Sequence, residues 1–553
     1  MNDQDNKIFG IDLGTTYSAI AYVDEYDKPL VVPNAENERV TPSVVFFDNE
    51  EIIIGQVAKE YAKTQPEDIV AFVKRSMGDS NFLFNHGNDS FRAEEISAYI
   101  LKKLVKDAEQ NLGVQIKDVV ITCPAYFGIN EREATQKAGE IANLNVRQII
   151  NEPTAAAITY GSMETNENKV VLVYDLGGGT FDTTMIEIKT DGINVICTGG
   201  DHNLGGKDWD DRIINHLVEQ FQNETGSKEE ILDDPETLQD LVLSAENAKK
   251  TLSQRDKAPV SVSHEGEKIK IQLDRTKFEE ITLDLLERTI SLTQEMLAEA
   301  KKKGFDTFDE ILLVGGSSRM PMISERIKQE FSVEPKLFDP DESVAKGAAI
   351  FGKKILLGDK LVEKISQLTN KDTQDIDLDS VDDKIKEEAM KNLSDDQAIP
   401  MPTLENIINK DIKNVTSKSF GIIALDDNQE ELVYNLVEKN STVPIDITKQ
   451  FGTSTNNQDN VLLQIMENEL SESTLKPDMA IEIGNAILDL PSGLPANSPI
   501  KVNFILNEEG RLDITAIEST DNRIVNATIE TNSVIQGDDL EEAKSRSIRM
   551  IVS

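Results

Sequence analysis

VVLVYDLGGGTFDTT, at residues 170–184, begins as an apolar, β-branched run and ends in a glycine-rich turn. The run predicts a buried strand, and it is followed by Asp175, three glycines, Thr180 and Asp182. Glycines let backbone N–H groups approach an anion because no Cβ lies in the way, whereas neighbouring carboxylates repel a bare phosphate. The turn therefore predicts a phosphate bound through a metal ion, although three glycines after a strand are also typical of a sharp bend.

A second turn of the same kind lies near the N-terminus, in IFGIDLGTTYS at residues 8–18. It again places an aspartate, Asp12, after an apolar strand, and Gly14, Thr15 and Thr16 follow. Segments that repeat one pattern within a chain indicate duplicated structural units. We therefore expect two similar lobes, each of which contributes one loop to a common ligand.

The length and charge of the chain limit its organisation and its partners. At 553 residues the chain is too long for a single core, and the usual prior is roughly three or four domains. Its formal net charge of −43 argues against nucleic acid and an anionic membrane as partners, because both would repel it. Excess acid also keeps a protein soluble, which is the simpler meaning of this charge.

The cysteines, histidines and N-terminus indicate a reducing compartment and no zinc site. Cys123 and Cys197 each lie in an apolar strand-like run, which predicts buried free thiols. The start MNDQDNK lacks the features of a signal peptide, and no run reaches the ~18 apolar residues that a membrane span needs. We therefore expect a soluble, cytoplasmic protein. No zinc-ligand spacing links the four histidines, which are His86, His202, His216 and His264.

Strands alternate with amphipathic helices from about residue 8 to residue 357, which predicts an α/β fold with a largely buried sheet. Three further segments place polar or glycine residues between a strand and a helix. They are IINEPTAAAITYG at 149–161, LGGKD at 204–208 and LLVGGSSRMP at 312–321. A helix N-terminus behind glycines favours an anion, so these segments extend the predicted ligand site.

Together these motifs resemble one family. IDLGTT, TCPAYF, IINEPTAAA, YDLGGGTFD, LGGKDWD, AENAKKTLS and LLVGGSSRMP occur in the order found in the heat shock protein 70 (DnaK-like) chaperones. The resemblance implies that residues 1–357 form a two-lobed, actin-like (ribonuclease-H-like) α/β ATPase domain. A P-loop ATPase is not expected, because no GxxxxGK[ST] motif occurs.

The resemblance implies a role for each matching residue of the phosphate site. The β- and γ-phosphates of ATP would contact Gly14, Thr15, Thr16, Gly177, Gly178, Gly179, Thr180, Gly205 and Gly206. Mg²⁺, its waters and K⁺ would be organised by Asp12, Asp175 and Asp182. Lys74 would lie beside the γ-phosphate, where a fixed cation offsets developing negative charge. Glu152 and Asp175 are the expected proton acceptors, and Thr180 and Asp12 complete the expected catalytic set.

The resemblance also implies a nucleoside site between two walls. One wall is the helix that carries Glu246, Lys249, Lys250 and Ser253, and the other consists of Gly315, Gly316, Ser317, Arg319 and Asp341. Without the family match, the charged helix residues would be an ordinary solvated surface. Lys250 replaces the arginine of many relatives, and an ammonium stacks less well on adenine, so we expect reduced nucleotide affinity. Lys207 likewise lies where many relatives have an acidic residue. Pro124 and Arg132 match positions that couple ATP hydrolysis to the second domain.

The composition changes between residues 358 and 414. Residues 359–399 contain twelve acids, six lysines and no glycine, proline or aromatic residue, so they are expected to bury little surface alone. Helical spacing of leucine and isoleucine predicts an extended acidic linker or insertion with one or two helices. Relatives have a short leucine-rich linker here, so family-type docking is expected only if Ile407, Ile408 and Ile412 act as substitutes.

From residue 415 to about residue 533 the apolar period becomes two, which predicts an all-β antiparallel sandwich. This segment resembles the peptide-binding β domain of the same family through TSKSFGI, EKNSTVP, QFGTSTNNQDNVLLQI and LPANSPIKVNFILNEEGRLDITA. Alternating apolar residues also suit the sandwich core itself. The resemblance implies a peptide pocket lined by Ile422, Leu425, Phe451, Val461 and Leu463, with Ser454 and Gln458 near an arch over the peptide.

Residues 534–553 are expected to form a short C-terminal helix, a remnant of the helical lid that follows the sandwich in relatives. Without a lid, bound peptide should dissociate faster, unless the insertion or a partner covers the site. A shortened sequence is the simpler alternative explanation of the missing lid.

The resemblance thus implies an ATP-dependent chaperone with weak ATPase activity, which switches the affinity of the sandwich for extended, unfolded polypeptides. A J-domain co-chaperone and a nucleotide-exchange factor are the expected protein partners. One alternative is a co-chaperone or nucleotide-exchange relative that binds ATP and scarcely cycles. A less favoured alternative is a small-molecule kinase on the actin-like scaffold, which gives no reason for the sandwich.

Overall fold

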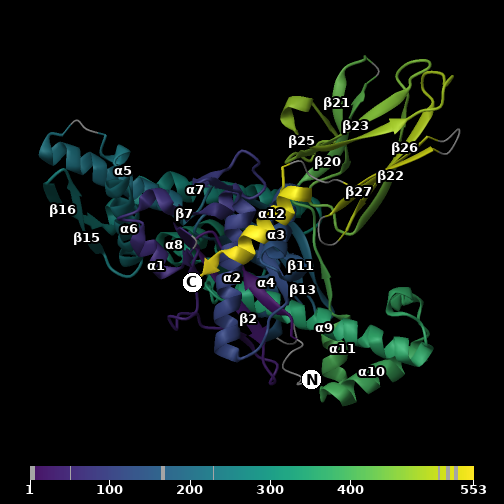
Figure 1. The fold of residues 1–553 in the computed structure, drawn as a ribbon, viewed down its shortest axis with the longest axis horizontal. Coiled ribbons are helices and arrows are strands. Elements are labelled where there is room, and N and C mark those ends of the chain that lie inside the picture. The colour runs from purple at the N-terminus through teal and green to yellow at the C-terminus, as the bar shows by residue number, and fades with distance from the viewer. Residues whose placement is uncertain are drawn as a thin grey trace.

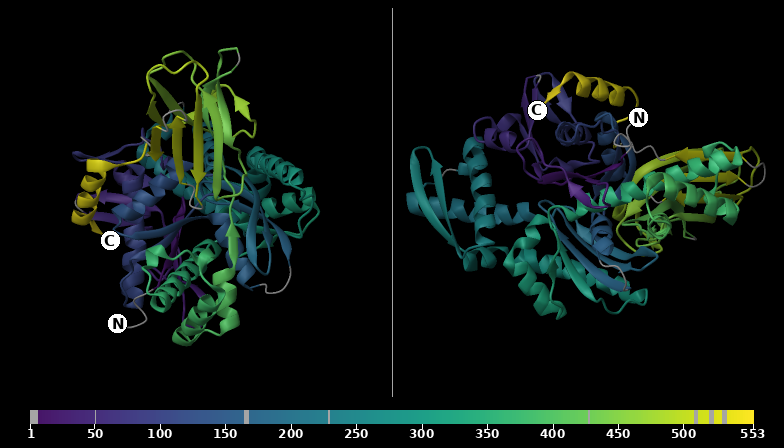
Figure 2. Two further views of the ribbon diagram at one scale, coloured as in Figure 1. Left: turned by 90° about the vertical axis from the view of Figure 1, so that its right-hand side faces the viewer. Right: turned by 90° about the horizontal axis from the view of Figure 1, so that it is seen from below.

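The computed structural model describes residues 7–49, 51–163, 168–227, 230–426, 428–507, 511–518, 523–528 and 533–553. Figure 1 shows a large α/β body, a β domain that projects at the upper right and a small helical module at the lower right. In the left view of Figure 2 the β domain lies at the top and the helical module at the bottom, so the two are separate. The fold is therefore mixed α/β with several separate sheets.

The first lobe of the body is built around a mixed sheet. Its elements are β1 (Phe9–Asp12), β2 (Tyr17–Val23), β3 (Pro29–Val31), β4 (Thr41–Pro42), β10 (Asp118–Cys123), β11 (Asn145–Asn151), α2 (Ala93–Leu112) and α3 (Ile129–Ile141). The sheet order is β11-β10-β1-β2-β3, with β4 paired to β2. β1 is parallel to β10 and antiparallel to β2, so Asp12 lies at the end of a central strand.

The second lobe repeats this central arrangement. Its elements are β12 (Lys169–Leu176), β13 (Phe181–Ile188), β14 (Gly192–Asp201), β17 (Glu310–Val314), β18 (Lys336–Leu337), β19 (Asp411–Lys413), α5 (Gly206–Thr225), α6 (Pro235–Leu252), β15 (Lys257–His264), β16 (Glu267–Asp274), α7 (Arg275–Lys302) and α8 (Pro321–Phe331). The sheet order is β18-β17-β12-β13-β14-β19. β12 is parallel to β17 and antiparallel to β13, as β1 is to β10 and β2. Each glycine turn thus connects a central strand to its antiparallel neighbour.

Two helices pack against each other between the lobes, α4 (Glu152–Met163) and α9 (Ser343–Thr369). They approach so closely that a Cβ on Gly347 would lie 1.8 Å from the carbonyl oxygen of Ala155. Their apolar side chains join one core with residues of both sheets, including Val120 and Val173. This shared core fixes where the two glycine turns face each other. Cys123 and Cys197 are buried and free, which confirms that prediction.

The β domain consists of two antiparallel sheets. Their strands are β20 (Ser419–Leu425), β21 (Glu431–Val437), β22 (Ile445–Gly452), β23 (Asn460–Asn468), β24 (Thr474–Leu475), β25 (Ile481–Asp489), β26 (Pro499–Leu506), β27 (Leu512–Glu518) and β28 (Arg523–Thr528). The orders are β24-β21-β20-β23-β25 and β22-β26-β27-β28. Inward residues of both sheets, such as Phe420 and Phe504, form one core, so the two sheets pack as a sandwich.

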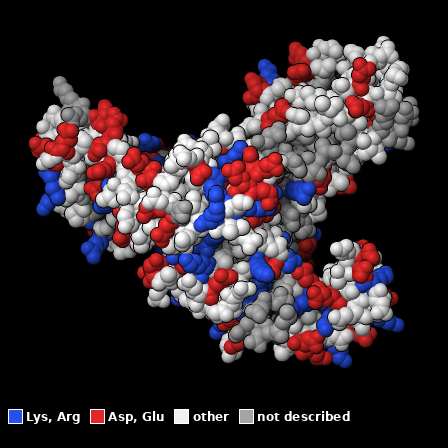
Figure 3. Space-filling view, viewed as in Figure 1, with Lys and Arg blue, Asp and Glu red and all other residues white. Residues whose placement is uncertain are grey.

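The segment expected to be an acidic linker or insertion with one or two helices forms a helical module. α9 continues through residue 358 to Thr369, and α10 (Asp383–Gln397) and α11 (Met401–Asn409) pack on it. Its buried residues are Leu357, Leu361, Ile365, Ala389, Met390, Leu393 and Leu404. The apolar residues are too sparse for an independent core, and they bury themselves against the extended α9. Figure 3 shows mixed acidic and basic side chains over this module.

The C-terminal segment contains α12 (Gly537–Arg549) and β29 (Ile551–Val552). α12 packs against α2 and α3 of the first lobe rather than over the sandwich, as Figure 2 shows. β29 joins a small sheet in the order β29-β6-β5-β7, whose other strands are β5 (Val44–Asp48), β6 (Glu51–Ile54) and β7 (Ile69–Ala71). Leu540 and Val552 belong to the first lobe's core, so this segment is part of that lobe.

Candidate active site

A cavity of about 1280 Å³ opens between the two lobes. Both glycine turns line it, and so do buried charged residues and the helix α6. The predicted residues among its lining are Asp12, Gly14, Thr15, Thr16, Lys74, Glu152, Asp175, Gly177, Gly178, Thr180, Glu246, Lys249, Lys250, Ser253, Gly315, Gly316, Ser317, Arg319 and Asp341. Side chains far apart in the sequence therefore converge on one cleft that is large enough for a nucleotide.

The two glycine turns contact each other at the floor of the cleft. A Cβ on Gly178 would lie 1.7 Å from Thr16 Oγ1, and one on Gly179 would lie 2.3 Å from Thr15 Cγ2. Only glycine fits at these positions, because any side chain would push the two lobes apart. The backbone N–H of Gly206 donates to Gly177 O at 3.0 Å. Gly205 and Gly206 thus support the second turn from behind.

Lys74 and Glu152 form an ion pair beneath these turns. Lys74 lies in the short 3₁₀ helix η3 (Val73–Ser76), and Glu152 is the first residue of α4. Burial alone would lower the pKa of Lys74, but the carboxylates of Glu152 and Asp12 hold it above its ordinary value. Lys74 therefore presents a permanent ammonium to the cleft.

Three aspartates surround this pair without sufficient positive charge to balance them. Burial and the nearby Glu152 raise the pKa of Asp12 to about 7. Burial and Glu152 also raise the pKa of Asp175 and of Asp182 well above the ordinary range. A bound cation would stabilise the ionised forms, so the charge balance of this cluster fits a metal site.

Two of these aspartates, Asp12 and Asp182, each accept a hydrogen bond from a different donor. Thr122 Oγ1 donates to Asp12 Oδ1 at 3.2 Å, and the Ala125 N–H donates to Asp182 Oδ1 at 2.9 Å. In the described part of the chain, no three His, Cys, Asp or Glu side chains are arranged to hold a metal ion by themselves. The hydroxyl of Thr16 is buried without a hydrogen-bond partner. A cation here would thus need oxygen ligands from a bound molecule or water as well.

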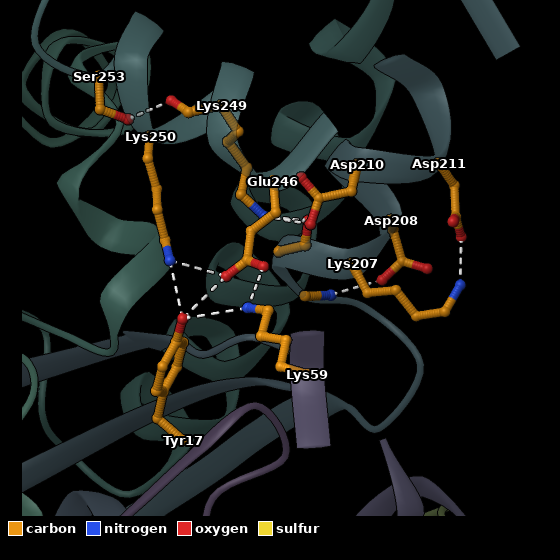
Figure 4. A network of polar contacts seen from close by, with 12 residues as sticks. Tyr17, Lys59, Lys207, Asp208, Asp210, Asp211, Glu246, Lys249, Lys250 and Ser253 are labelled. Atoms are coloured by element: carbon orange, nitrogen blue, oxygen red, sulfur yellow. Dashed lines mark hydrogen bonds and ion pairs between the residues drawn. The ribbon is translucent and has the colours of Figure 1, made fainter. Parts of the chain in front are cut away.

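The nucleoside side of the cleft carries a network that connects the lobes (Figure 4). Tyr17 OH donates to Glu246 Oε1 at 3.0 Å, and Lys59 pairs with Oε2 of the same carboxylate. Lys250 Nζ lies 2.8 Å from Glu246 Oε1 and 2.8 Å from Tyr17 OH. Burial would raise the pKa of Glu246, but Lys59 and Lys250 lower it to about 2. Both carboxylate oxygens of Glu246 therefore have partners within the protein.

Lys249 takes part in a second arrangement on the same wall. Its ammonium donates to Asp210 Oδ2 and to Gly206 O, both at 2.6 Å. Burial raises the pKa of Asp210 to about 6, although Lys249 opposes this. Ser253 Oγ donates to Lys249 O at 2.9 Å, so Ser253 caps its own helix. Arg319 and Asp341 form an ion pair on the opposite wall.

Sequence reasoning missed several residues of the site. Arg75 donates to Gly179 O at 2.8 Å and pairs with Asp208 at 2.6 Å, so it supports the second turn. Tyr17 directly follows the first glycine turn, and Arg75 follows Lys74, so proximity to a motif was the available signal. Lys59 lies on α1 (Gln56–Tyr61), whose sequence carries no such signal. Lys207 pairs with Asp211 at 2.5 Å at the edge of the cleft.

The start of the sandwich segment contacts the first lobe next to the predicted allosteric residues. Arg132 donates to Phe127 O at 3.0 Å and to Asn151 Oδ1 at 2.5 Å. Pro124 starts the turn that leads to Phe127. From the sandwich side, Ser417 Oγ donates to Phe127 O at 3.0 Å. Pro124 and Arg132 thus lie in the segment that meets the sandwich.

The linker also docks on the second lobe. β19 extends the sheet as a parallel partner of β14, with Ile412 opposite Ile193. Ile412 packs against the core between the lobes, whereas Ile407 and Ile408 pack into the helical module. Of the three substitutes considered, Ile412 therefore makes the docking contact.

The predicted peptide residues divide into three groups. Ile422 and Leu463 belong to the sandwich core, and Phe451 and Val461 pack at its margin. Leu425 is 41% exposed at the end of β20. Ser454 N and Oγ donate to Gln458 Oε1 at 2.9 and 3.2 Å, which holds the loop between β22 and β23.

Comparison with known proteins identifies the class. The sequence model of the family described as Hsp70 protein matches residues 8–82 and 80–394. The Chaperone protein DnaK of Halobacterium salinarum strain ATCC 29341 / DSM 671 / R1 is 35% identical over 546 residues, which cover 97% of this chain and 77% of the relative. The corresponding protein of strain ATCC 700922 / JCM 11081 / NRC-1 gives the same values. The chain belongs to the Hsp70 family.

Membership of this family defines the general activity. The protein is an ATP-dependent chaperone with weak ATPase activity, and Hsp70 ATPases use ATP and ADP with Mg²⁺. A DnaK-like chaperone binds unfolded polypeptides. The family has actin-like ATPase lobes and a β-sandwich. Among the described helices, none combines the length and the apolar character that crossing a membrane requires.

Proposed function

We propose that ATP binds in the cleft between the lobes and that its hydrolysis switches the affinity of the sandwich for extended polypeptides. The two lobes would then be the actin-like ATPase unit, formed mainly by residues 1–357, to which β19, α12 and β29 are added. One observation carries the coupling: β19, which leads into the sandwich, is paired with β14 of the second lobe. A change in that lobe's sheet therefore reaches the sandwich through backbone hydrogen bonds.

The buried charges of the cleft support specific catalytic roles. Lys74 would neutralise charge on the transferred phosphoryl group, because its ammonium is held in place by Glu152. Glu152 and Asp175 would accept the proton of the attacking water, since both carboxylates line the cleft beside Lys74. The Thr180 hydroxyl would orient the terminal phosphate, and Asp12 would complete the set.

Asp12, Asp175 and Asp182 would hold Mg²⁺ and K⁺, mainly through water and phosphate oxygens, since the protein alone provides no complete ligand set among its described residues. When bound, these ions would neutralise the phosphates and the aspartates. The phosphates would lie against Gly14, Thr15, Thr16 and residues 177–179, with Gly205 and Gly206 behind them. The nucleoside would lie between α6 and the wall formed by residues 315–319 and Asp341.

Peptide binding would rest on the backbone as well as on the predicted pocket. One buried leucine contributes roughly 1.5–3 kcal/mol, whereas micromolar affinity needs about 8 kcal/mol. Main-chain hydrogen bonds to an extended peptide would supply the remainder by β-augmentation. Leu425, Phe451 and Val461 are the accessible members of the predicted pocket. Ile422 and Leu463 would contribute through the core, and Ser454 and Gln458 would fix the loop.

We further propose that the protein acts in the cytoplasm with a J-domain co-chaperone and a nucleotide-exchange factor. The experiment that tests the switching function is release of a fluorescent extended peptide with and without ATP. We expect ATP to accelerate release, and Ile412→Asp to abolish the acceleration, because a charge at this half-buried position opposes docking of β19. Matched Lys413→Asp, at an exposed residue, should retain it. Unaccelerated release by the unmodified protein would instead favour a non-cycling co-chaperone.

A further inference from the structure

The helical module and the strand that leads into the sandwich are joined by a single residue. α11 ends at Asn409 and β19 begins at Asp411, so only Lys410 lies between them. The Asp411 N–H donates to Asp191 O at 2.9 Å, and a Cβ on Gly161 would lie 3.8 Å from Lys410 Nζ. The junction between module and strand therefore lies directly against the body.

At its other end the module is continuous with the two lobes. α9 passes as one helix from the core between the lobes into the module. Ala348 of α9 belongs to the core shared by both sheets, whereas Leu361 and Ile365 belong to the core of the module. Where α9 leaves the lobes, Asp359 pairs with Arg147 of β11 at 2.7 Å. The helix α9 therefore holds the module in a fixed position on the body.

α11 is attached to this module through its apolar face. Leu404 is 0% exposed, and Ile407 and Ile408 pack against the same core. The neighbouring helix α10 is tied to α9 by Lys360 Nζ, which donates to Gln397 Oε1 at 2.6 Å. Figure 1 shows α10 and α11 beside the end of α9. A folded path thus leads from the body through α9, α10 and α11 to β19.

This path matters because β19 itself is short. It makes three register pairs with β14, from Gly192 opposite Asp411 to Asn194 opposite Lys413, and so short a pairing is weak alone. If residues 370–410 were flexible, pairing would close a loop of about 40 residues, and the probability of closure falls as about the −3/2 power of loop length. The folded module removes most of this cost and raises the effective concentration of β19 at β14 on the order of 100-fold.

We propose that the helical module keeps β19 paired with β14, so that the linker is docked on the second lobe before any nucleotide binds. This inference rests on the coupling role of β19 in the proposed function and states how that coupling is regulated. β19 can leave β14 only if α11 separates from the module or the module moves with it. The stability of the module therefore sets how readily the linker is released.

Hydrogen–deuterium exchange of residues 411–413, in the full chain without nucleotide, tests this role. An insertion of about ten glycine and serine residues between Lys410 and Asp411 separates β19 from the module and leaves both sequences intact. We expect the protection factors of residues 411–413 to fall about tenfold or more, because the tether becomes longer and flexible. The same insertion between Lys371 and Asp372, in the exposed turn between α9 and α10, keeps the junction and should preserve the protection.

A second pair of variants changes α11 without lengthening the chain. Leu404→Ala removes the buried anchor of α11 and should also lower the protection of residues 411–413. Glu405→Ala, at an exposed position of the same helix, should leave that protection unchanged.

The exchange measurements decide the proposal. Unchanged protection after the insertion at Lys410 overturns it, and so does an equal loss in the two insertion variants. If the first insertion prevents folding, unchanged protection in folded Leu404→Ala overturns the proposal instead. ATP-accelerated release of peptide by the unmodified protein is measured in parallel. Its absence would overturn the proposed switching function, while the exchange of residues 411–413 still decides the role of the module.

Discussion

Docking of the sandwich on the first lobe should weaken as the pH rises. Glu467 of β23 accepts a hydrogen bond from the N–H of Ile129, at the start of α3, at 3.2 Å. Burial and the facing carboxylate of Glu131 raise the pKa of Glu467 to about 7, although Lys418 opposes them. The ordinary pKa of a glutamate is 4.5. Docking therefore favours the protonated form of Glu467.

The sign and size of the effect follow from these two values. Below pH 4.5 Glu467 is protonated whether docked or free, so docking carries no penalty. Between pH 4.5 and about 7 only the undocked state loses the proton, so docking weakens over this range, and above about 7 both states are ionised and the penalty stays constant. A pKa difference of about 2.5 corresponds to a change of about 3 kcal/mol in the free energy of docking. This value is an upper limit, because Glu467 is partly exposed and water screens its charge. The docking equilibrium should fall by up to about 100-fold.

Hydrogen–deuterium exchange between pH 5 and pH 8 measures this directly. We expect protection factors of residues 128–132 and 411–415 to decrease with pH, while those of the β15–β16 hairpin stay constant. Glu467→Gln keeps an acceptor for Ile129 and should abolish the pH dependence. Glu469→Gln, a more exposed neighbour that pairs with Lys418, should preserve it. Protection factors that rise with pH in the unmodified protein would refute the reasoning. So would a pH dependence of protection that is unchanged in Glu467→Gln.

Three further changes test the cleft and the helical module. Lys74→Met should lower the single-turnover rate of ATP hydrolysis by about 10²–10³-fold, and an unchanged rate would remove Lys74 from the mechanism. Gly178→Ala should weaken ATP binding by about tenfold or more in calorimetry, since its Cβ would lie 1.7 Å from Thr16 Oγ1. Gly358→Ala, where a Cβ meets no atom within 4 Å, is the matched control. Leu393→Ala should destabilise the helical module by about 2–5 kcal/mol, seen as faster exchange throughout α10, and undiminished protection would contradict its packing role.

The strands and turns were the most predictable part of this protein. VVLVYDLGGGTFDTT predicted a strand that ends at Asp175, and β12 with its turn is that structure. Short-range periodicity and glycine placement act locally, so the sequence carries them directly. The contact between Lys74 and Glu152 could not be predicted from such local patterns. No local pattern joins these residues, and family resemblance was the only route to placing them together.

The failures of prediction have a common physical cause. Leu361 and Leu393 were recognised at helical spacing, but their burial depends on a contact between α9 and α10 that composition does not reveal. Lys59 and Asp210 belong to the site through charges brought in from other elements. Tertiary partners of this kind decide both burial and pKa, whereas a local segment reports only its own propensity.

The chain connects the sandwich to a different lobe at each of its two ends. The chain enters it through β19, which belongs to the second lobe, and leaves it towards α12 and β29, which belong to the first. The sandwich is thus connected through the chain to both lobes. A rotation of one lobe that changed the separation of these two attachment points would strain the strands between them. Opening of the nucleotide cleft would be transmitted mechanically as tension across the sandwich, even without a change in any single contact residue.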